Sequence, residues 1–303
     1  MALTQQELTL NISAVERDTG LSKDTLRMWE RRYGFPDPQR DANGERMYPI
    51  EQVHKLQLIK RLMDQGHRPG KIIARPVEEL TSLGNLRVAP VPLRQDLEVF
   101  LKLIRAHQLP ELRRHLSQTL MRQGLHAFII DTIAPLNQAV GEAWMRGEFA
   151  VFEEHLYTEQ IQSVLRNAVA SMQPQGRAPR VLLTSFPQEP HSLGLLMVEA
   201  LLAVEGASCV PMGTEMPLEE IARAAQAHKV EVVALSFSSA FNEKQAVQGL
   251  GELRALLPAH IAIWAGGTGL ARVRRPIRDV ELICDLYGLV ERVKEWRTVH
   301  ASI

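Results

Sequence analysis

The C-terminal part of the chain alternates short apolar runs with longer amphipathic stretches, and this alternation is the strongest constraint on its fold. Short apolar runs are typical of buried strands, whereas apolar residues repeated every three or four positions are typical of helices. We expect strands at Val181–Ser185, Ala207–Val210, Glu231–Leu235, Ala259–Trp264 and Glu281–Cys284. We expect helices at Ser192–Glu205, Pro217–His228, Asn242–Leu256, Leu270–Arg275 and Tyr287–Arg297. Single helices between short strands indicate a doubly wound parallel sheet.

Polar residues and glycines follow these strands at the carboxyl edge of the sheet, where open α/β sheets bind ligands. Glu189, His191 and Gly194 come after the first strand, in the spacing Glu-x-His-x-x-Gly. The third strand is followed by Ser236 and Ser238, and the fourth by Gly266 and Gly267, where backbone can approach a bulky ligand closely. A single histidine after a strand is more often a hydrogen-bonded loop residue than a metal ligand. A ligand site is therefore indicated by the set and not by His191 alone.

Residues 95–171 predict an all-helical module, because apolar residues recur at helical spacing and strand formers do not cluster. Four helices are expected, at 95–106, 110–124, 125–146 and 150–171. Within this module Trp144 is followed by Glu154 and His155. An indole can cover one face of a flat ligand, while a carboxylate accepts hydrogen bonds from it. The alternative is a core tryptophan beside a solvated Glu–His pair.

The N-terminal residues predict a helix-turn-helix. A short helix after Leu10 leads to a turn at Thr19–Ser22, and Ser22 is a suitable N-cap for a second helix, Lys23–Tyr33. A hairpin with its turn at Asn43-Gly44 follows. Two further helices are expected at 50–65 and 69–74.

Residues 25–48 resemble the recognition helix and wing of the MerR family of DNA-binding regulators. The resemblance implies a winged helix-turn-helix that binds double-stranded DNA. Arginine suits both phosphates and base edges, and Leu26 and Trp29 are expected in the core. The residues expected at the DNA are Arg27, Arg31, Arg32, Arg40, Arg46 and Tyr48.

The Glu-x-His-x-x-Gly segment resembles the motif of flavodoxin-like cobalamin-binding domains. The resemblance implies that His191 is the lower axial ligand of cobalt and that Glu189 orients it. It also places Gly194, Ser236, Ser238, Gly266 and Gly267 at the cofactor, although the usual Ser-x-Leu of the family is Ser236-Phe237-Ser238 here. Trp144, Glu154 and His155 are similar to the residues that cap adenosylcobalamin in CarH-type light-responsive repressors.

Met145 departs from that pattern. In members whose light-exposed form carries two histidine ligands, the residue after the tryptophan is a histidine, and a thioether is a poor ligand for oxidised cobalt. The sequence therefore supports cobalamin binding better than it supports a photochemical locking step. Whether the protein responds to light is left open at this point.

The order of these segments implies a winged-helix domain (1–77), a linker (78–94), a helical bundle (95–172) and an α/β domain (179–303). We expect a repressor, not an enzyme, that responds to adenosylcobalamin through a change of oligomeric state, as a dimer or tetramer on its operator. One rival is a MerR-type repressor whose sheet domain serves only oligomerisation, protein contacts or another ligand. Another is a corrinoid methyl carrier, which would not need residues 27–48.

Charge and cysteine content agree with a DNA-binding protein of the cytoplasm. The chain has 35 basic and 35 acidic residues. Residues 1–75 hold 13 Lys and Arg against 10 Asp and Glu, so the basic end is the predicted DNA-binding end. No apolar stretch is long enough to span a bilayer, and a cytoplasmic location without membrane contact is expected. Cys209 and Cys284 are expected as buried thiols.

Overall fold

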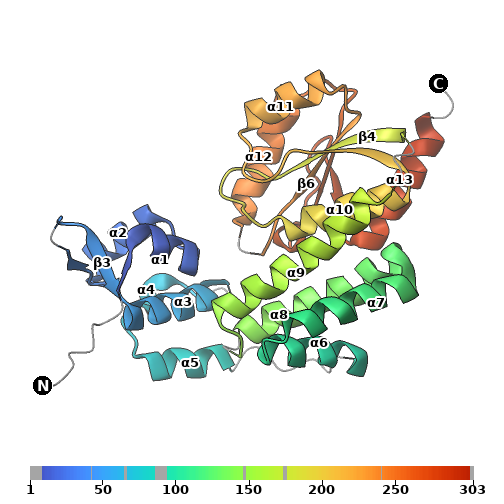
Figure 1. Cartoon of the computed structure of the whole chain (residues 1–303). Helices are drawn as coiled ribbons and strands as arrows, with labels where there is room; N and C mark the ends of the chain where they lie inside the picture. Colours follow the sequence, from blue (N-terminus) through green and yellow to red (C-terminus); the bar gives the residue numbers. More distant parts are fainter. Residues whose placement is uncertain are drawn as a thin grey trace, which may run out of the picture. The chain divides into compact units, whose positions relative to one another are not determined.

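The computed structural model describes residues 9–41, 43–64, 67–85, 94–145, 148–172, 176–239 and 241–300. The chain divides into two compact units. One comprises residues 1–94 and 138–154, and the other comprises 95–137 and 155–303 (Figure 1).

The first unit contains a three-stranded antiparallel sheet and five helices of the N-terminal part of the chain. The sheet has the order β1-β3-β2, with Leu10 opposite Tyr48 and Arg40 opposite Arg46. The helices and strands of this N-terminal part are β1 (Thr9–Asn11), α1 (Ile12–Thr19), α2 (Lys23–Tyr33), β2 (Gln39–Arg40), β3 (Arg46–Pro49), α3 (Ile50–Asp64), α4 (Pro69–Ile72) and α5 (Val77–Asn85).

Helix caps define the helix-turn-helix. Asn11 caps α1 by accepting a hydrogen bond from the backbone N–H of Ala14 over 2.9 Å. Gly20 ends that helix in the left-handed conformation, at φ 68°, which costs glycine no steric strain. Ser22 Oγ then accepts from the N–H of Thr25 over 3.2 Å, so the predicted N-cap of α2 is present.

The structure differs from the sequence prediction between the N-terminal and helical modules. Residues 78–85 of the predicted linker, 78–94, belong to α5, although the sequence there had suggested no apolar face. Leu80 is fully buried in the same core as Leu26 and Trp29, which accounts for the helix. The domain boundaries themselves stay predictions.

The helical module follows the expected order with one break. It consists of α6 (Gln95–Arg105), α7 (Leu109–Ala127), a π-helical segment η1 (Phe128–Ile133), α8 (Ala134–Met145) and α9 (Val151–Ala170). Gly124 has φ 75° and kinks α7, and the next helical segment begins close to the predicted position. Five of the six residues of η1, all except Asp131, are buried, so this segment belongs to the core of the module.

The α/β domain has a five-stranded parallel sheet of order β5-β4-β6-β7-β8, which is the flavodoxin-like order. The alternation predicted a doubly wound parallel sheet, and the family resemblance implied its flavodoxin-like form. Its strands are β4 (Arg177–Thr184), β5 (Ala207–Pro211), β6 (Val232–Ser236), β7 (Ala262–Gly266) and β8 (Glu281–Ile283). Its helices are α10 (Leu193–Val204), α11 (Leu218–Ala227), α12 (Glu243–Leu256) and α13 (Leu286–His300), with a 3₁₀ turn, η2 (Thr268–Leu270).

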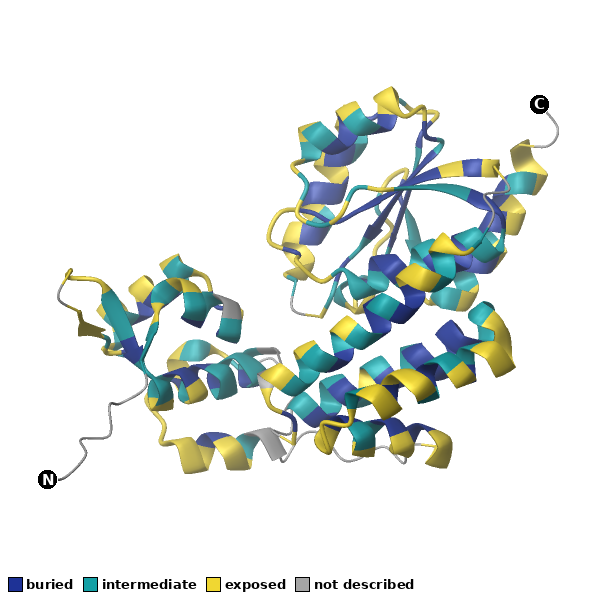
Figure 2. Ribbon diagram, in the orientation of Figure 1, coloured by how far each residue is buried: buried dark blue, intermediate teal, exposed yellow. Residues whose placement is uncertain are grey.

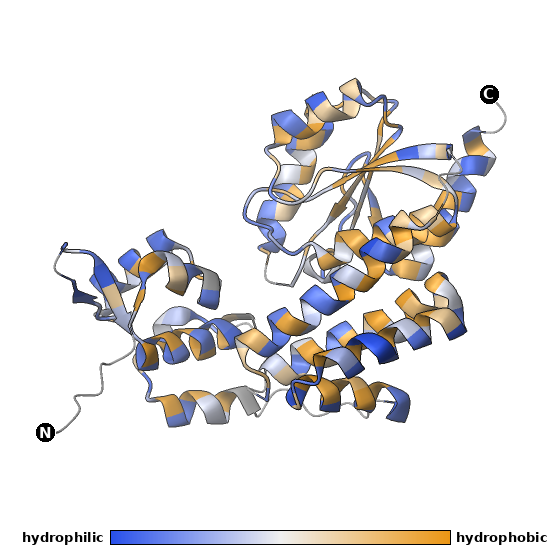
Figure 3. Cartoon of the chain, viewed as in Figure 1, coloured by the Kyte–Doolittle hydropathy of each residue, from blue (hydrophilic) through white to orange (hydrophobic). Residues whose placement is uncertain are grey.

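Two helices cover each face of this sheet. Helix α10 contacts α13 on one face, and α11 contacts α12 on the other (Figure 1). The central strands are buried (Figure 2) and strongly hydrophobic (Figure 3). The face under α11 and α12 is filled by residues such as Leu235, Phe237 and Leu250, all at most 3% exposed.

The predicted helix Leu270–Arg275 is wrong. Only the 3₁₀ turn η2 forms there, and residues 273–280 have no regular structure. A six-residue helix is too short to be stable without extensive packing, and Pro276 disfavours the helical conformation at Arg275. In the described parts of the chain, no helix combines the length and apolar character needed to cross a membrane.

Candidate functional site

One face of α2 is exposed and carries charged side chains. Asp24, Arg27, Met28 and Arg31 are all exposed, whereas Leu26 and Trp29 on the opposite side are buried, as predicted. Arg27 Nη1 lies 3.4 Å from Asp24 Oδ1. Two of the predicted DNA-contacting arginines thus lie on the outer face of the second helix of a helix-turn-helix, together with an acidic and an apolar side chain.

The remaining exposed arginines lie beside this face and on the hairpin. Arg32 stacks over the ring of Tyr33, with 5.3 Å between its guanidinium carbon and the ring centroid. Arg40 Nη1 donates to the carbonyl of Gly44 over 2.7 Å, which ties the arginine to the hairpin turn. Gly44 has φ 79°, a conformation that favours glycine, and the turn lies where the sequence predicts it.

Tyr48 corrects the sequence prediction, because its side chain is fully buried and does not face a DNA-accessible surface. Burial raises the pKa of its hydroxyl. Tyr48 belongs to the core cluster that also contains Leu26 and Trp29 of α2. Tyr48 is therefore a core residue of the first unit.

Arg46 is also engaged within the fold. Its Nε lies 2.8 Å from Glu30 Oε2, and both side chains are 28% exposed. The hydrogen bond to Glu30 raises the pKa of Arg46. Because Glu30 belongs to α2 and Arg46 to β3, this ion pair fixes the recognition helix against the hairpin.

Arg61 forms a contact that the sequence did not indicate. Its guanidinium lies over the ring of Trp144, at 4.8 Å from the centroid, and Nη2 lies 3.5 Å from the carbonyl oxygen of Phe149. Burial lowers the pKa of Arg61. This contact joins the last turn of α3 to Trp144 on α8, and no periodicity or motif could have paired residues so distant in the chain.

At the carboxyl edge of the five-stranded sheet, the loop after β4 presents His191. Its side chain is 58% exposed, whereas that of Glu189 is 1% exposed. Glu189 Oε1 lies 2.6 Å from His191 Nδ1, and the same carboxylate accepts from the N–H of His191 over 3.2 Å. Its second oxygen accepts from the N–H of Ser238 over 2.7 Å.

These contacts decide the charge of Glu189 and the orientation of the histidine. Burial by itself disfavours the ionised carboxylate, but the hydrogen bonds from His191 and Ser238 outweigh it and hold the pKa of Glu189 below its ordinary value. An ionised acceptor at Nδ1 places the ring proton there. The other ring nitrogen, Nε2, is then the one with a lone pair for a metal.

Ser185 supports the same loop. Its buried hydroxyl donates to the carbonyl of Glu189 over 2.6 Å and accepts from the N–H of Glu215 over 3.0 Å. It thereby ties the loop after β4 to the loop after β5. Sequence reasoning did not assign this role, although it placed Ser185 at the end of the predicted strand.

Glycines at this edge allow neighbouring loops to pack closely. A Cβ atom on Gly194 would lie 2.6 Å from Ser236 Oγ, and one on Gly266 would lie 2.9 Å from the carbonyl oxygen of Ile283. Gly267 has φ 101° and packs against the backbone of Phe237. The structure thus gives these glycines a packing role between loops, and their predicted contact with a cofactor stays a prediction.

Three segments of the chain match known families. Residues 10–74 match the MerR HTH family regulatory proteins. Residues 97–168 and 179–278 each match a B12-binding domain. The chain thus combines a segment similar to MerR HTH regulators with two segments similar to B12-binding domains.

Two curated proteins from Myxococcus xanthus are similar to most of the chain. The HTH-type transcriptional repressor CarH is 29% identical over 268 residues, which is 86% of this chain and 89% of the relative. The HTH-type transcriptional repressor CarA is 29% identical over 269 residues, 86% of this chain and 88% of the relative. These similarities confirm the prediction of a DNA-binding regulator linked to cobalamin, not an enzyme.

A solved structure supports the fold of the B12-binding part. The monomethylamine corrinoid protein of Methanosarcina barkeri superimposes with a TM-score of 0.55 at 14% identity, over 67% of this chain and 98% of that protein. At this identity the likeness concerns the fold alone.

The residues predicted to cap the cofactor lie on two helices of the regulator. Trp144, on α8, and Glu154, on α9, are half-buried and belong to the first unit; His155, on α9, is exposed and belongs to the second. Met145 ends α8, and its side chain lies outside the described residues. The predicted role of these residues at a cofactor stays a prediction.

Helix α9 also contacts the loop of the B12-binding domain that carries the histidine. Gln162 Nε2 donates over 3.1 Å to the hydroxyl of Ser192, which is the residue directly after His191. The side chain of Gln162 is buried, although the sequence pattern had not singled it out. The helical module and the His191 loop of the second unit are thus in direct contact.

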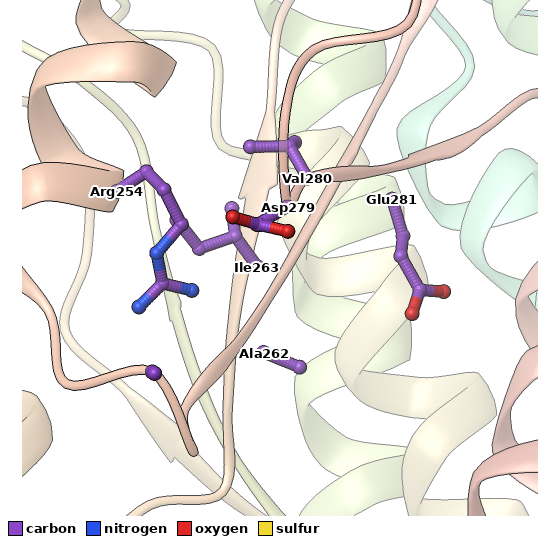
Figure 4. A pocket seen from close by; sticks show the side chains of 7 residues that line it. Arg254, Ala262, Ile263, Asp279, Val280 and Glu281 are labelled. Atoms are coloured by element: carbon purple, nitrogen blue, oxygen red, sulfur yellow. The ribbon is translucent and has the colours of Figure 1, made fainter.

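The hollow shown in Figure 4 belongs to the opposite edge of the sheet. It measures about 410 Å³ and is lined by residues at the start of β7 and β8, including Ala262 and Glu281. Arg254 beside it donates to three backbone carbonyls, those of Leu257, Pro258 and Ile261, so it stabilises the fold. This hollow is separate from the His191 edge.

The cysteines are only partly as predicted. Cys209 is half-buried, and burial raises the pKa of its thiol to about 12. Cys284 is exposed, contrary to expectation, because it lies just beyond the three-residue strand β8 at the edge of the sheet. Among the described residues no group of three His, Cys, Asp or Glu side chains forms a metal site.

Proposed function

We propose that this regulator is a repressor whose affinity for its operator is controlled by adenosylcobalamin. The observation that carries the proposal is the Glu189–His191 pair at the carboxyl edge of the sheet. Bound adenosylcobalamin would supply a cobalt atom that can accept an imidazole from the protein. It would also bring an adenosyl group that light can remove from the cobalt. Residues of this chain would supply the imidazole, its orientation and the surrounding loops.

The donor set at this edge fits such a cofactor. The corrin ring brings its own equatorial ligands, so one histidine from the protein is sufficient, and no cluster of metal-binding side chains is needed. His191 is on an exposed loop, and the buried carboxylate of Glu189 at 2.6 Å fixes both the orientation and the tautomer of its ring. Ser238 contributes its backbone N–H to this arrangement. The departure from the family's Ser-x-Leu therefore leaves the hydrogen bond to Glu189 in place.

Control of DNA binding would act through the number of DNA-binding domains held together. The first 75 residues carry an excess of only three positive charges, and a single small basic domain binds DNA weakly. A dimer or tetramer presents several such domains at once and raises operator affinity through effective concentration. Adenosylcobalamin would favour this assembly if it binds the assembled form more tightly than the free chain. We place this activity in the cytoplasm.

Cofactor binding and the light response are two separate proposals, because Met145 stands where light-responsive relatives carry a histidine. We propose that illumination, where it acts, gives a form without a second histidine ligand, since a thioether binds oxidised cobalt poorly. The Met145→His variant should acquire a spectrum typical of two imidazole ligands after illumination. A wild-type spectrum that already shows two imidazoles, and loses one in His155→Ala, would move the upper-ligand role to His155.

The proposal is tested by titrating the full chain with adenosylcobalamin in the dark while recording its absorption spectrum and its mass by light scattering. We expect binding with a histidine-ligated spectrum and an increase in oligomer size. His191→Ala should lose both while keeping its circular dichroism spectrum, because the residue lies in an exposed loop. Assembly without any cobalamin binding would favour the rival in which the sheet domain serves oligomerisation alone.

A further inference from the structure

Met28 is an exposed apolar side chain on the DNA-facing helix. It is 41% exposed, whereas the neighbouring apolar residues of α2, Leu26 and Trp29, are 0% and 2% exposed. Met28 therefore contributes little to the core of the first unit. Its side chain is therefore available for contact with a bound partner.

Its place on the helix is defined by the helical repeat. Residues 24, 27, 28 and 31 follow the spacing i, i+3, i+4, i+7 and so lie on one face of α2, opposite the buried face of Leu26 and Trp29. In a helix-turn-helix this outer face of the second helix enters the major groove. Met28 thus belongs to the face of α2 that would meet base edges.

The two arginines beside Met28 on this face, Arg27 and Arg31, have hydrogen-bond partners within α2. Arg27 is held by Asp24 at 3.4 Å, and Arg31 Nε lies 3.4 Å from the carbonyl oxygen of Arg27. These guanidinium groups can donate to phosphates or to guanine. Met28 has no donor and only a weak sulfur acceptor, so it can contribute to recognition only by apolar contact.

The thymine C5-methyl group is the apolar group that bases present in the major groove. We infer that Met28 packs against a thymine methyl of the operator and makes the regulator favour thymine at that position. The flexible thioether chain can adapt to the methyl while the arginines beside it hold the phosphates. This inference rests on the DNA-binding role of α2.

The test uses a duplex selected from random DNA by the full chain with adenosylcobalamin in the dark. Each thymine of the duplex is replaced in turn by uracil, which removes only the methyl group. We expect one thymine per half-site at which uracil weakens binding about four-fold, the effect of exposing one buried methyl-sized group. Because only the DNA is changed, the folding of the protein is unaffected.

The Met28→Ala variant then completes a double-mutant cycle. On the thymine duplex it should bind several-fold more weakly than the wild type, and on the duplex with uracil at the critical position the two proteins should differ much less. Met28→Leu, which keeps an apolar side chain, should retain most of the preference. Met121→Ala is the matched control, since Met121 is 77% exposed on α7, far along the chain from α2.

Two results would overturn the inference. One is that no thymine-to-uracil change affects the wild type. The other is that Met28→Ala weakens binding equally on the thymine and uracil duplexes. Arg31→Ala separates this failure from a failure of the DNA-binding assignment, because it should weaken binding on both duplexes whether or not Met28 reads a methyl group.

Discussion

Replacing Glu189 by glutamine should weaken cobalamin binding through the tautomer of His191. The native carboxylate accepts three hydrogen bonds, from His191 Nδ1 at 2.6 Å, the N–H of His191 at 3.2 Å and the N–H of Ser238 at 2.7 Å. Glutamine has one acceptor oxygen and one donor amide. If its oxygen faces Ser238, its NH₂ group faces His191 Nδ1. That nitrogen must then accept, and the ring proton moves to Nε2, the atom proposed to bind cobalt.

The opposite orientation of the glutamine is no better. Its NH₂ group would then face the N–H of Ser238, and two donors would meet in a buried place. A hydrogen bond to a charged group contributes about 1.5–3 kcal/mol. At about 1.4 kcal/mol per tenfold change, this corresponds to roughly a 10- to 100-fold loss of affinity. The same range is typical when a residue that orients a metal ligand is lost.

The assay is a spectral titration of the full chain with adenosylcobalamin in the dark, comparing the wild type, Glu189→Gln and Glu219→Gln. Glu219 is exposed on α11, so its variant controls for the loss of a negative charge. We expect a large rise in the dissociation constant for Glu189→Gln only. Equal affinity and an unchanged histidine-ligated spectrum in a correctly folded Glu189→Gln protein would refute the reasoning.

Three further outcomes are expected. Arg31→Ala should weaken operator binding and lower the slope of log affinity against log salt by about 1, as measured by fluorescence anisotropy at several salt concentrations; an unchanged slope would remove Arg31 from the phosphate contacts. Arg61→Ala and Trp144→Leu should show a coupling of about 0.5–2 kcal/mol in denaturant unfolding, the range for a cation–π contact, and additive effects would argue against their interaction. Because the pKa of Glu189 is lowered in the fold, its contribution to stability is complete above its ordinary value of 4.5 and is lost as pH falls through the lowered pKa. The difference in melting temperature between wild type and Glu189→Gln should therefore disappear in acid, and a constant difference from pH 7 to pH 3 would contradict this.

Local signals in the sequence were sufficient for the helix-turn-helix. Ser22 is an N-cap and Gly20 a left-handed helix end, and both act within a few residues of their own position. The doubly wound, parallel character of the sheet was also predictable from the alternation of strands and helices. Properties of this kind depend on short stretches of chain.

Features that depend on distant partners could not be predicted. Tyr48 was expected at the DNA because it belongs to the hairpin motif, but its side chain is buried in the core that contains Leu26 and Trp29. The contact of Arg61 with Trp144 joins residues 83 positions apart in the numbering. Gln162 and Ser192 likewise meet only through the packing of α9 on the loop that follows β4. Tertiary packing decides each of these cases.

The central claim is that cobalamin binding at His191 and DNA binding by α2 are linked. Its most direct test is the affinity of the full chain for its selected operator duplex in the dark, with and without saturating adenosylcobalamin, for the wild type and for His191→Ala. We expect adenosylcobalamin to tighten operator binding by the wild type within the range of about 5- to 150-fold that is common for linked sites, and to leave His191→Ala unchanged. Equal operator affinity of the wild type with and without bound adenosylcobalamin would contradict the account.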